Sequence, residues 1–198
     1  MEAFVRYHRT YHPSHKVGLA FCAGTNQHMG QFLHTGLVTG VYTWATVDDN
    51  SDTNPTVVGN ARNHRLLRSL PQQYFDVVLF PNCPYTVYGT HSFDHHWFRM
   101  IKNLVKTGGE IWFNGLPGLE GYWRYDDFEE EYASHFQQQE ADLLRRVSGT
   151  EPTPYLEDQL RWLQEHLDPS ARLEIRPTIM PWDCTPRCRR AVFLVITV

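Results

Sequence analysis

The sequence lacks long apolar runs, internal repeats and low-complexity tracts. No stretch reaches the roughly 18 consecutive apolar residues that a transmembrane helix requires. The opening residues, MEAFVRYHRTYHPSHK, contain no apolar core of the kind that secretory signal peptides carry. From these absences we expect a soluble, cytoplasmic protein that does not enter a membrane.

An excess of basic charge is also missing. The net charge is -4 with the histidines neutral, and the sequence pI is about 6.2. A protein that holds nucleic acid over a wide surface usually carries a basic face. An extended nucleic-acid surface is therefore not indicated. A local basic patch stays open, formed by Arg145, Arg146, Arg187, Arg189 and Arg190.

Cysteine is scarce, with four residues in the chain: Cys22, Cys83, Cys184 and Cys188. Their small number and scattered positions predict reduced thiols rather than a disulfide scaffold. The spacing of Cys184 and Cys188 is compatible with zinc, and His91 and His95 have a helical spacing that would put them on one face. A structural zinc site needs about four ligands, so we predict no metal.

What remains is a globular composition. The chain has 198 residues, of which 41% are hydrophobic and 14% aromatic, enough to build one sizeable core. We therefore expect a single domain over residues 1–198. Within it, residues 1–16 are predicted to be an irregular lead-in and residues 116–170 a mainly helical segment.

Short apolar runs that stop at turn residues predict buried strands. They occupy residues 17–22, 41–47, 56–60, 75–80 and 110–114. Helical patterns follow the first, third and fourth of these runs, at residues 27–37, 62–70 and 92–106, the last with Ser92 as its N-cap. Two further strands are expected at 173–180 and 190–198. This alternation predicts an α/β fold with a mostly parallel sheet, helices on both faces and an antiparallel C-terminal strand.

Four short motifs stand at the ends of these predicted strands. Residues 19–26 read LAFCAGTN, residues 47–50 read VDDN, residues 59–61 read GNA, and residues 75–78 read FDVV. In this order and spacing the chain resembles a class I, Rossmann-like S-adenosylmethionine-dependent methyltransferase over about residues 15–115. The resemblance implies the Rossmann-like methyltransferase fold, S-adenosylmethionine as cofactor, and transfer of its methyl group to an acceptor.

The resemblance also implies which residues hold the cofactor. Ligands of open α/β sheets bind beyond the carboxyl ends of the strands, where a carboxylate can accept two hydrogen bonds from a ribose diol. The implied cofactor residues are Cys22, Ala23, Gly24 and Thr25 in the turn, Asp48 or Asp49 at the ribose, Asn60 and Ala61 beside the adenine, and Pro81 after the fourth strand.

Catalytic candidates follow the fourth predicted strand. Residues 82–85, NCPY, resemble the N-P-P-Y motif of amino-group methyltransferases, which implies that Asn82 and Tyr85 hold a planar amine. The alternative is a plain turn that ends the strand. His91 or His95 is a candidate general base, with His91 as the first choice. The acceptor stays open between a small molecule, a protein and a nucleic acid, and the sequence gives no oligomeric state.

Three positions depart from the family pattern. Ala20 replaces the acid of the first strand, Cys22 replaces the first glycine of the turn, and Asn26 replaces the last one. These departures motivate an alternative function, a catalytically inactive methyltransferase-like domain that acts as a binding or scaffolding protein. A different nucleotide-binding Rossmann domain is the third hypothesis, and the absence of G-x-G-x-x-G argues against a dinucleotide.

Overall fold

The structure is a computed structural model that describes residues 1–23, 40–41, 43–80, 94–113, 124–126, 165, 171–180 and 188–198. For residues 124–126, 173–180 and 188–194 it describes the backbone only. Its helices are α1 (Glu2–Tyr11), α3 (His64–Ser69) and α4 (His95–Leu104), with a 3-10 helix, η1, at Ser51–Thr53. Its strands are β1 (Val17–Phe21), β2 (Thr43–Asp48), β3 (Val57–Val58), β4 (Phe75–Phe80), β5 (Val105–Phe113), β6 (Arg124–Asp126), β7 (Arg172–Met180) and β8 (Cys188–Thr197).

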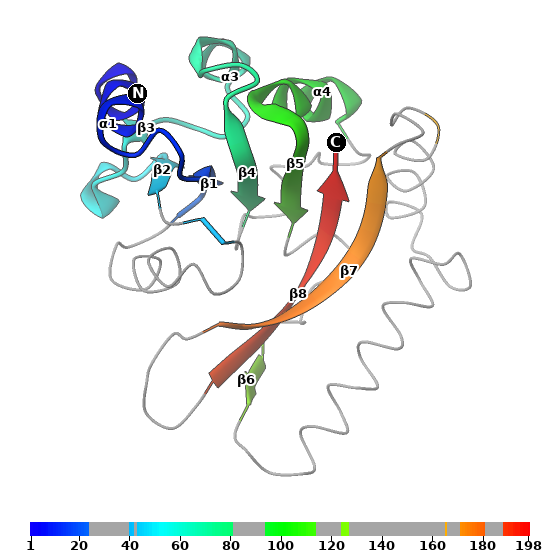
Figure 1. Cartoon of the computed structure of the whole chain (residues 1–198). Helices are drawn as coiled ribbons and strands as arrows, with labels where there is room; N and C mark the ends of the chain where they lie inside the picture. The colour runs from blue at the N-terminus through cyan, green and yellow to red at the C-terminus, as the bar shows by residue number, and fades with distance from the viewer. Residues whose placement is uncertain are drawn as a thin grey trace.

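The strands form one sheet in the order β3-β2-β1-β4-β5-β8-β6, with β7 paired to β8 (Figure 1). Strands β1 to β5 are parallel to one another, and β8 is antiparallel to β5, β6 and β7. The chain builds outward from β1 to β3, then returns to add β4 and β5 on the other side of β1. This reversal makes a topological switch point between β1 and β4. The predicted Rossmann-like α/β class, with an antiparallel C-terminal strand, is confirmed.

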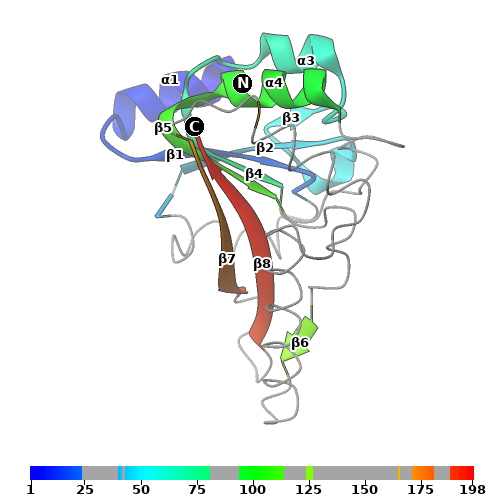
Figure 2. The ribbon, with the colours of Figure 1, turned by 90° about the vertical axis from the view of Figure 1, so that its right-hand side faces the viewer.

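Helices α1, α3 and α4 all lie on one side of the sheet (Figures 1 and 2). Side chains of α3 and α4 bury against that face, among them Leu67, Trp97, Phe98, Ile101 and Leu104. The opposite face is also shielded, since Ala20, Leu79 and Trp112 are inaccessible to solvent.

The helix predicted at 27–37 lies outside the described residues. None of the helices that the structure describes is long and apolar enough to cross a membrane.

Three phenylalanines stack at the carboxyl ends of neighbouring parallel strands. Phe21, Phe80 and Phe113 are the last residues of β1, β4 and β5. The ring centroids of Phe21 and Phe80 are 5.0 Å apart at 8°, and those of Phe80 and Phe113 are 5.0 Å apart at 16°. Trp97 of α4 packs against the middle ring, with a centroid distance of 5.3 Å. Aromatic burial of this kind makes a large contribution to the core, and it aligns the three strand ends.

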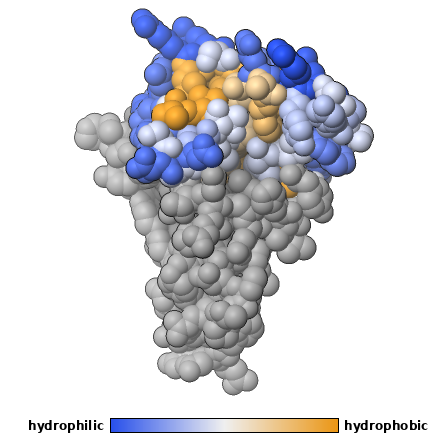
Figure 3. Space-filling view, turned by 90° about the vertical axis from the view of Figure 1, so that its left-hand side faces the viewer, coloured by the Kyte–Doolittle hydropathy of each residue, from blue (hydrophilic) through white to orange (hydrophobic). Residues whose placement is uncertain are grey.

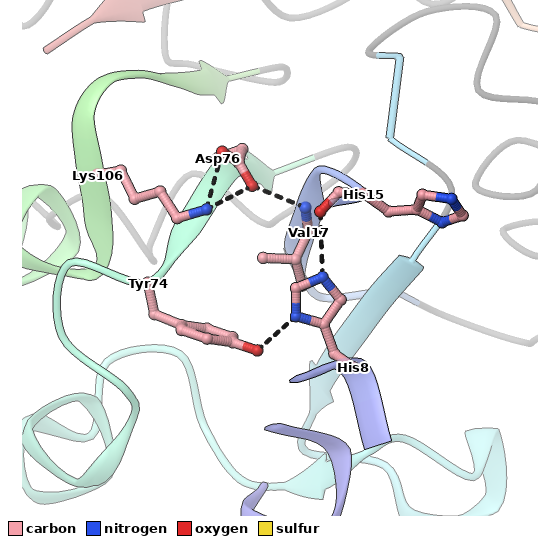
Figure 4. A network of polar contacts seen from close by, with 6 residues as sticks. All are labelled: His8, His15, Val17, Tyr74, Asp76 and Lys106. Atoms are coloured by element: carbon pink, nitrogen blue, oxygen red, sulfur yellow. Dashed lines mark hydrogen bonds and ion pairs between the residues drawn. The ribbon is translucent and has the colours of Figure 1, made fainter. Parts of the chain in front are cut away.

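A carboxylate holds the opposite ends of the same strands (Figure 4). Asp76 Oδ2 accepts a hydrogen bond of 2.8 Å from the backbone N–H of Val17, at the start of β1. Lys106 Nζ, near the start of β5, donates to both carboxylate oxygens of Asp76 at 3.0 and 2.9 Å. One side chain of β4 therefore ties the beginnings of its two neighbours.

The predicted irregular lead-in is wrong for Glu2–Tyr11, which forms α1. The helix docks through His8, which is 5% exposed. Its Nδ1 lies 2.7 Å from the hydroxyl of Tyr74, and its Nε2 lies 3.1 Å from the carbonyl oxygen of His15 (Figure 4). Burial raises the pKa of Tyr74, against an opposing effect of Arg9. A carbonyl oxygen only accepts, so Nε2 of His8 donates to His15, and the phenol of Tyr74 is the partner of Nδ1.

The junction between α4 and β5 also differs from the prediction. The helix begins with Asp94 as its N-cap, whose Oδ1 accepts from the N–H of Trp97 at 2.9 Å. It ends at Leu104, and β5 starts at once, before the predicted strand at 110–114. Gly108, at φ +78°, and Gly109 accommodate an irregularity inside β5 rather than stopping a helix. A Cβ on Gly109 would meet the carbonyl oxygen of Asp76 at 2.8 Å, so glycine suits this close approach.

The antiparallel strands extend past the carboxyl edge of the parallel ones (Figure 1). Phe113 at the end of β5 pairs with Leu194, so residues 188–193 of β8 continue beyond it. At about 3.3 Å per residue this extension is about 20 Å long. Strands β6 and β7 flank it on either side, and Arg190 is opposite Arg124 in the register.

We predict that Phe80→Ala lowers the free energy of unfolding by about 3–5 kcal/mol, because it removes the middle ring of the stack and leaves a cavity. Urea denaturation measures the change. The control is Tyr11→Ala, whose side chain is 68% exposed and should cost less than about 1 kcal/mol. Equal effects of the two substitutions would contradict the role given to the stack.

Candidate functional site

Three segments of the chain meet at the carboxyl edge of the parallel sheet. The backbone N–H of Cys22, just after β1, donates to the carbonyl oxygen of Val47 in β2 at 2.9 Å. The N–H of Gly59, just after β3, donates to the carbonyl oxygen of Asp48 at 2.8 Å. The turn after β1, the end of β2 and the loop after β3 are therefore neighbours. This edge, beside the switch point, is where open α/β sheets bind ligands.

Cys22 has a left-handed backbone, with φ of +52°. Glycine adopts this conformation without steric cost, whereas other residues rarely do. The backbone after β1 thus follows a path typical of glycine, although the side chain is that of cysteine. Ala23 is buried next to it, and Gly24 and Thr25 lie outside the described residues.

The sulfur of Cys22 takes part in a disulfide bond. The prediction of reduced thiols is therefore wrong for this residue. None of the other three cysteines has a described side chain, so the partner lies outside the described side chains. The bond places a covalent link at the turn that follows β1.

Two neighbouring acids stand at the end of β2 in different environments. Asp48, the last residue of the strand, is 9% exposed, and its Oδ1 accepts from the N–H of Asn50 at 2.9 Å. This contact is an Asx turn, which holds the carboxylate at the strand end. Asp49 is exposed, and its Oδ2 lies 3.4 Å from Nδ2 of Asn60. Asp48 is thus an acceptor held in place at the edge, and Asp49 reaches toward the loop after β3.

The loop after β3 is shaped by Asn60. Its Oδ1 accepts from the N–H of Arg62 at 2.8 Å, and its carbonyl oxygen accepts from the N–H of Asn63 at 2.9 Å. Asn63 then caps α3, since its Oδ1 accepts from the first amides of that helix. Both polar atoms of the Asn60 amide are engaged within the loop or with Asp49. The side chain therefore fixes the loop conformation, a role that its sequence position did not reveal.

The two backbone polar groups of Ala61 differ in their hydrogen bonding. Its carbonyl oxygen accepts from Nε1 of Trp97 at 2.9 Å. Its N–H donates to no acceptor in the described part of the chain. The residue is 5% exposed. A fixed N–H donor beside a small apolar side chain is suited to a planar heterocycle that carries a ring acceptor.

The structure brings Cys22, Ala23, Asp48, Asp49, Asn60 and Ala61 to one edge of the sheet. Pro81, Asn82, Tyr85 and His91 lie outside the described residues, so their predicted roles stay predictions.

Among the side chains that the structure describes, no group of three or more histidine, cysteine or acidic residues is placed to hold a metal ion. Sequence reasoning missed Trp97, because its partner is 36 positions away and no local pattern marks it.

A separate groove of about 510 Å³ runs along α1. It is lined by Met1, Glu2, Val5, Arg6, Arg9, Thr10, Ser69 and Pro71. Figure 3 views the side of the molecule on which α1 lies and shows apolar surface bordered by hydrophilic surface. Pro71 precedes β4, so the groove lies at the amino end of that strand, away from the edge formed by Cys22, Asp48 and Ala61.

No protein-family model matches the chain, and no curated protein matches it. Among solved structures, it is similar to the DszA carbon methyltransferase, with a TM-score of 0.47 and 16% identity over 99% of this chain and 52% of that one. It is also similar to the trans-methyltransferase CalH in complex with SAH, with a TM-score of 0.45 and 12% identity over 99% of this chain and 55% of that one.

The chain thus spans about half the length of both of these proteins. Identities and TM-scores at this level do not assign the chain to a family. Its fold class follows from its own strand order and registers, which define an open, Rossmann-like sheet whose strand order reverses at β1.

We predict that Asp48→Ala lowers the free energy of unfolding by about 1.5–3 kcal/mol, because the N–H of Asn50 loses a charged acceptor. Asp48→Asn keeps an oxygen in the same place and should cost less than about 1 kcal/mol. Chemical denaturation of the two variants checks both values. If Asp48→Asn is as unstable as Asp48→Ala, the negative charge itself is needed for folding.

Proposed function

We propose that this chain binds S-adenosylmethionine at the carboxyl edge of β1 and β2 and transfers its methyl group to an acceptor. The observation that carries the proposal is the hydrogen bond between Gly59 N–H and the carbonyl oxygen of Asp48, 2.8 Å long. It brings the acid at the end of β2 and the loop containing Ala61 to the same place. The two resulting groups, a fixed carboxylate and a fixed N–H donor, match a ribose diol and an adenine ring.

In this proposal each segment of the edge holds one part of the cofactor. Asp48 accepts hydrogen bonds from the ribose, with Asp49 as the alternative, and Ala61 donates to the adenine. The turn that starts at Cys22 lies against the methionine end. The carboxylates of Asp48, Asp49 and Asp52 follow one another closely in the chain, and their negative charge favours a ligand that carries a sulfonium cation.

The bound cofactor would supply an electrophilic methyl group, and the chain would position the acceptor. Alignment of the reacting atoms can provide much of the acceleration. A general base is needed only if the acceptor must lose a proton. We assign Asn82 and Tyr85 to the acceptor side and His91 to the base as part of the same proposal. The acceptor is a small molecule, a protein or a nucleic acid.

A second candidate function is a methyltransferase-like domain that binds a partner without catalysis. Ala20, the residue in the position of the family's acid, offers no charge to the amino group of the cofactor. The disulfide at Cys22 adds a covalent link to the turn that would contact the methionine end. A domain of this kind would show no affinity for the cofactor, which separates the two candidates.

We predict that Asp48→Asn weakens the binding of S-adenosylhomocysteine about 10- to 100-fold, because the ribose loses charge-assisted hydrogen bonds of about 1.5–3 kcal/mol. Isothermal titration calorimetry gives the affinity, and a thermal shift supports it, since ligand at about 100 times Kd stabilises the fold by about 2.7 kcal/mol. Asp49→Asn is the matched control and should change Kd less than about threefold.

The outcomes of this comparison distinguish the two possible ribose ligands and the two candidate functions. If Asp49→Asn weakens binding and Asp48→Asn does not, Asp49 is the ribose ligand. If the wild-type chain binds S-adenosylhomocysteine and both variants bind it with the same Kd, the ribose does not bind at the end of β2. If the folded wild-type chain binds neither S-adenosylmethionine nor S-adenosylhomocysteine, the second candidate function replaces the first.

A further inference from the structure

The loop after β3 is fastened to α4 by two contacts between residues far apart in the sequence. Nε1 of Trp97 donates to the carbonyl oxygen of Ala61 at 2.9 Å, and the indole is 0% exposed. The guanidinium of Arg62 forms an ion pair with the carboxylate of Asp94. Two consecutive loop residues are thus bound to the first turn of one helix and its N-cap.

Asp94 connects these contacts to the start of the helix. Its Oδ1 accepts from the N–H of Trp97 at 2.9 Å as the N-cap, while its Oδ2 is paired with Arg62. Trp97 is held in turn by the aromatic stack, at ring-centroid distances of 5.3 Å from Phe80 and 6.3 Å from Phe113. The position of the loop is therefore set by the same packing that aligns the strand ends.

The loop has little freedom of its own to compensate for a lost contact. Its shape is held by hydrogen bonds from Arg62 N–H to Asn60 Oδ1 and from Asn63 N–H to the Asn60 carbonyl oxygen. It is joined to β2 through Gly59. A loop with a fixed shape moves as a unit, so the contact with Trp97 decides where the N–H of Ala61 points.

We propose that Trp97, with the pair formed by Arg62 and Asp94, is a positioning device for the adenine end of the cofactor. The inference rests on the proposed function, because it assumes that the base lies beside Ala61. None of the three side chains needs to touch the ligand. They act through the loop, since displacement of a binding group by a fraction of an ångström is enough to weaken a preorganised site.

The chain contains a matched control for Trp97. Trp112 in β5 is equally buried, and its Nε1 also donates one hydrogen bond, of 2.8 Å, to Glu110 Oε2. It lies on the opposite face of the sheet from Phe113, because side chains alternate along a strand. Replacement of either tryptophan by phenylalanine removes one buried indole donor, but only Trp97 holds the loop.

The first test compares Trp97→Phe with Trp112→Phe by calorimetric titration with S-adenosylhomocysteine. We expect Trp97→Phe to raise Kd about tenfold and Trp112→Phe to change it less than about twofold. Both variants should lose similar stability in urea, because both lose one hydrogen bond donated by a buried indole. Equal values of Kd for the two variants would overturn the proposal.

A second pair of variants avoids the core. Arg62→Gln removes the ion pair with Asp94, and Arg65→Gln removes an exposed charge from the neighbouring helix α3. We expect Arg62→Gln to raise Kd about threefold to tenfold and Arg65→Gln to leave it within about twofold. This pair decides the question even if Trp97→Phe does not fold. Equal Kd values for Arg62→Gln and Arg65→Gln would overturn the role of the ion pair.

Hydrogen exchange of the ligand-free protein separates a failure of this inference from a failure of the proposed function. The amide of Gly59 is hydrogen-bonded to Asp48 of β2, and those of Arg62 and Asn63 are hydrogen-bonded to Asn60 within the loop. We expect them to exchange faster in Trp97→Phe than in Trp112→Phe, whether or not the chain binds the cofactor. Unchanged exchange would overturn the positioning role. Faster exchange in a chain without cofactor affinity would keep that role and reject the proposed function.

Discussion

The stack of Phe21, Phe80 and Phe113 is the interaction on which the rest of the structure depends. Each ring ends one of three neighbouring parallel strands, and the rings lie nearly parallel at 5.0 Å spacings. A shift of one strand by one residue would turn its ring to the other face, so the stack holds the registers. It also provides the platform on which Trp97 and therefore α4 rest.

Aligned strand ends have a chemical consequence, because the polar groups that follow them are brought to one edge. Asp48 ends β2, Cys22 follows β1, and hydrogen bonds to Val47 and Asp48 carry the turn after β1 and the loop after β3 to the same place. At the other end of the strands Asp76 joins Val17 and Lys106. Aromatic packing at one end of the strands and a charged contact at the other thus hold this edge in a fixed arrangement.

Much of the fold was predictable, and the reasons differ between elements. The bounds of β4 were predicted correctly because an apolar run stops at Pro81. Asp48 was placed correctly at the end of β2 because acids follow an apolar run. The helix α1 was missed because a buried histidine, His8, occupies an apolar position, and its partner Tyr74 is distant in sequence. The left-handed backbone at Cys22 and the contact between Trp97 and Ala61 depend on tertiary structure, which no local pattern encodes.

The most direct test of the central claim is a crystal structure of the chain with S-adenosylhomocysteine. We expect the ribose hydroxyls within about 2.5–3.0 Å of the Asp48 carboxylate and the adenine beside the N–H of Ala61. Ligand bound elsewhere on the molecule, or no ligand at this edge at saturating concentration, would contradict the account.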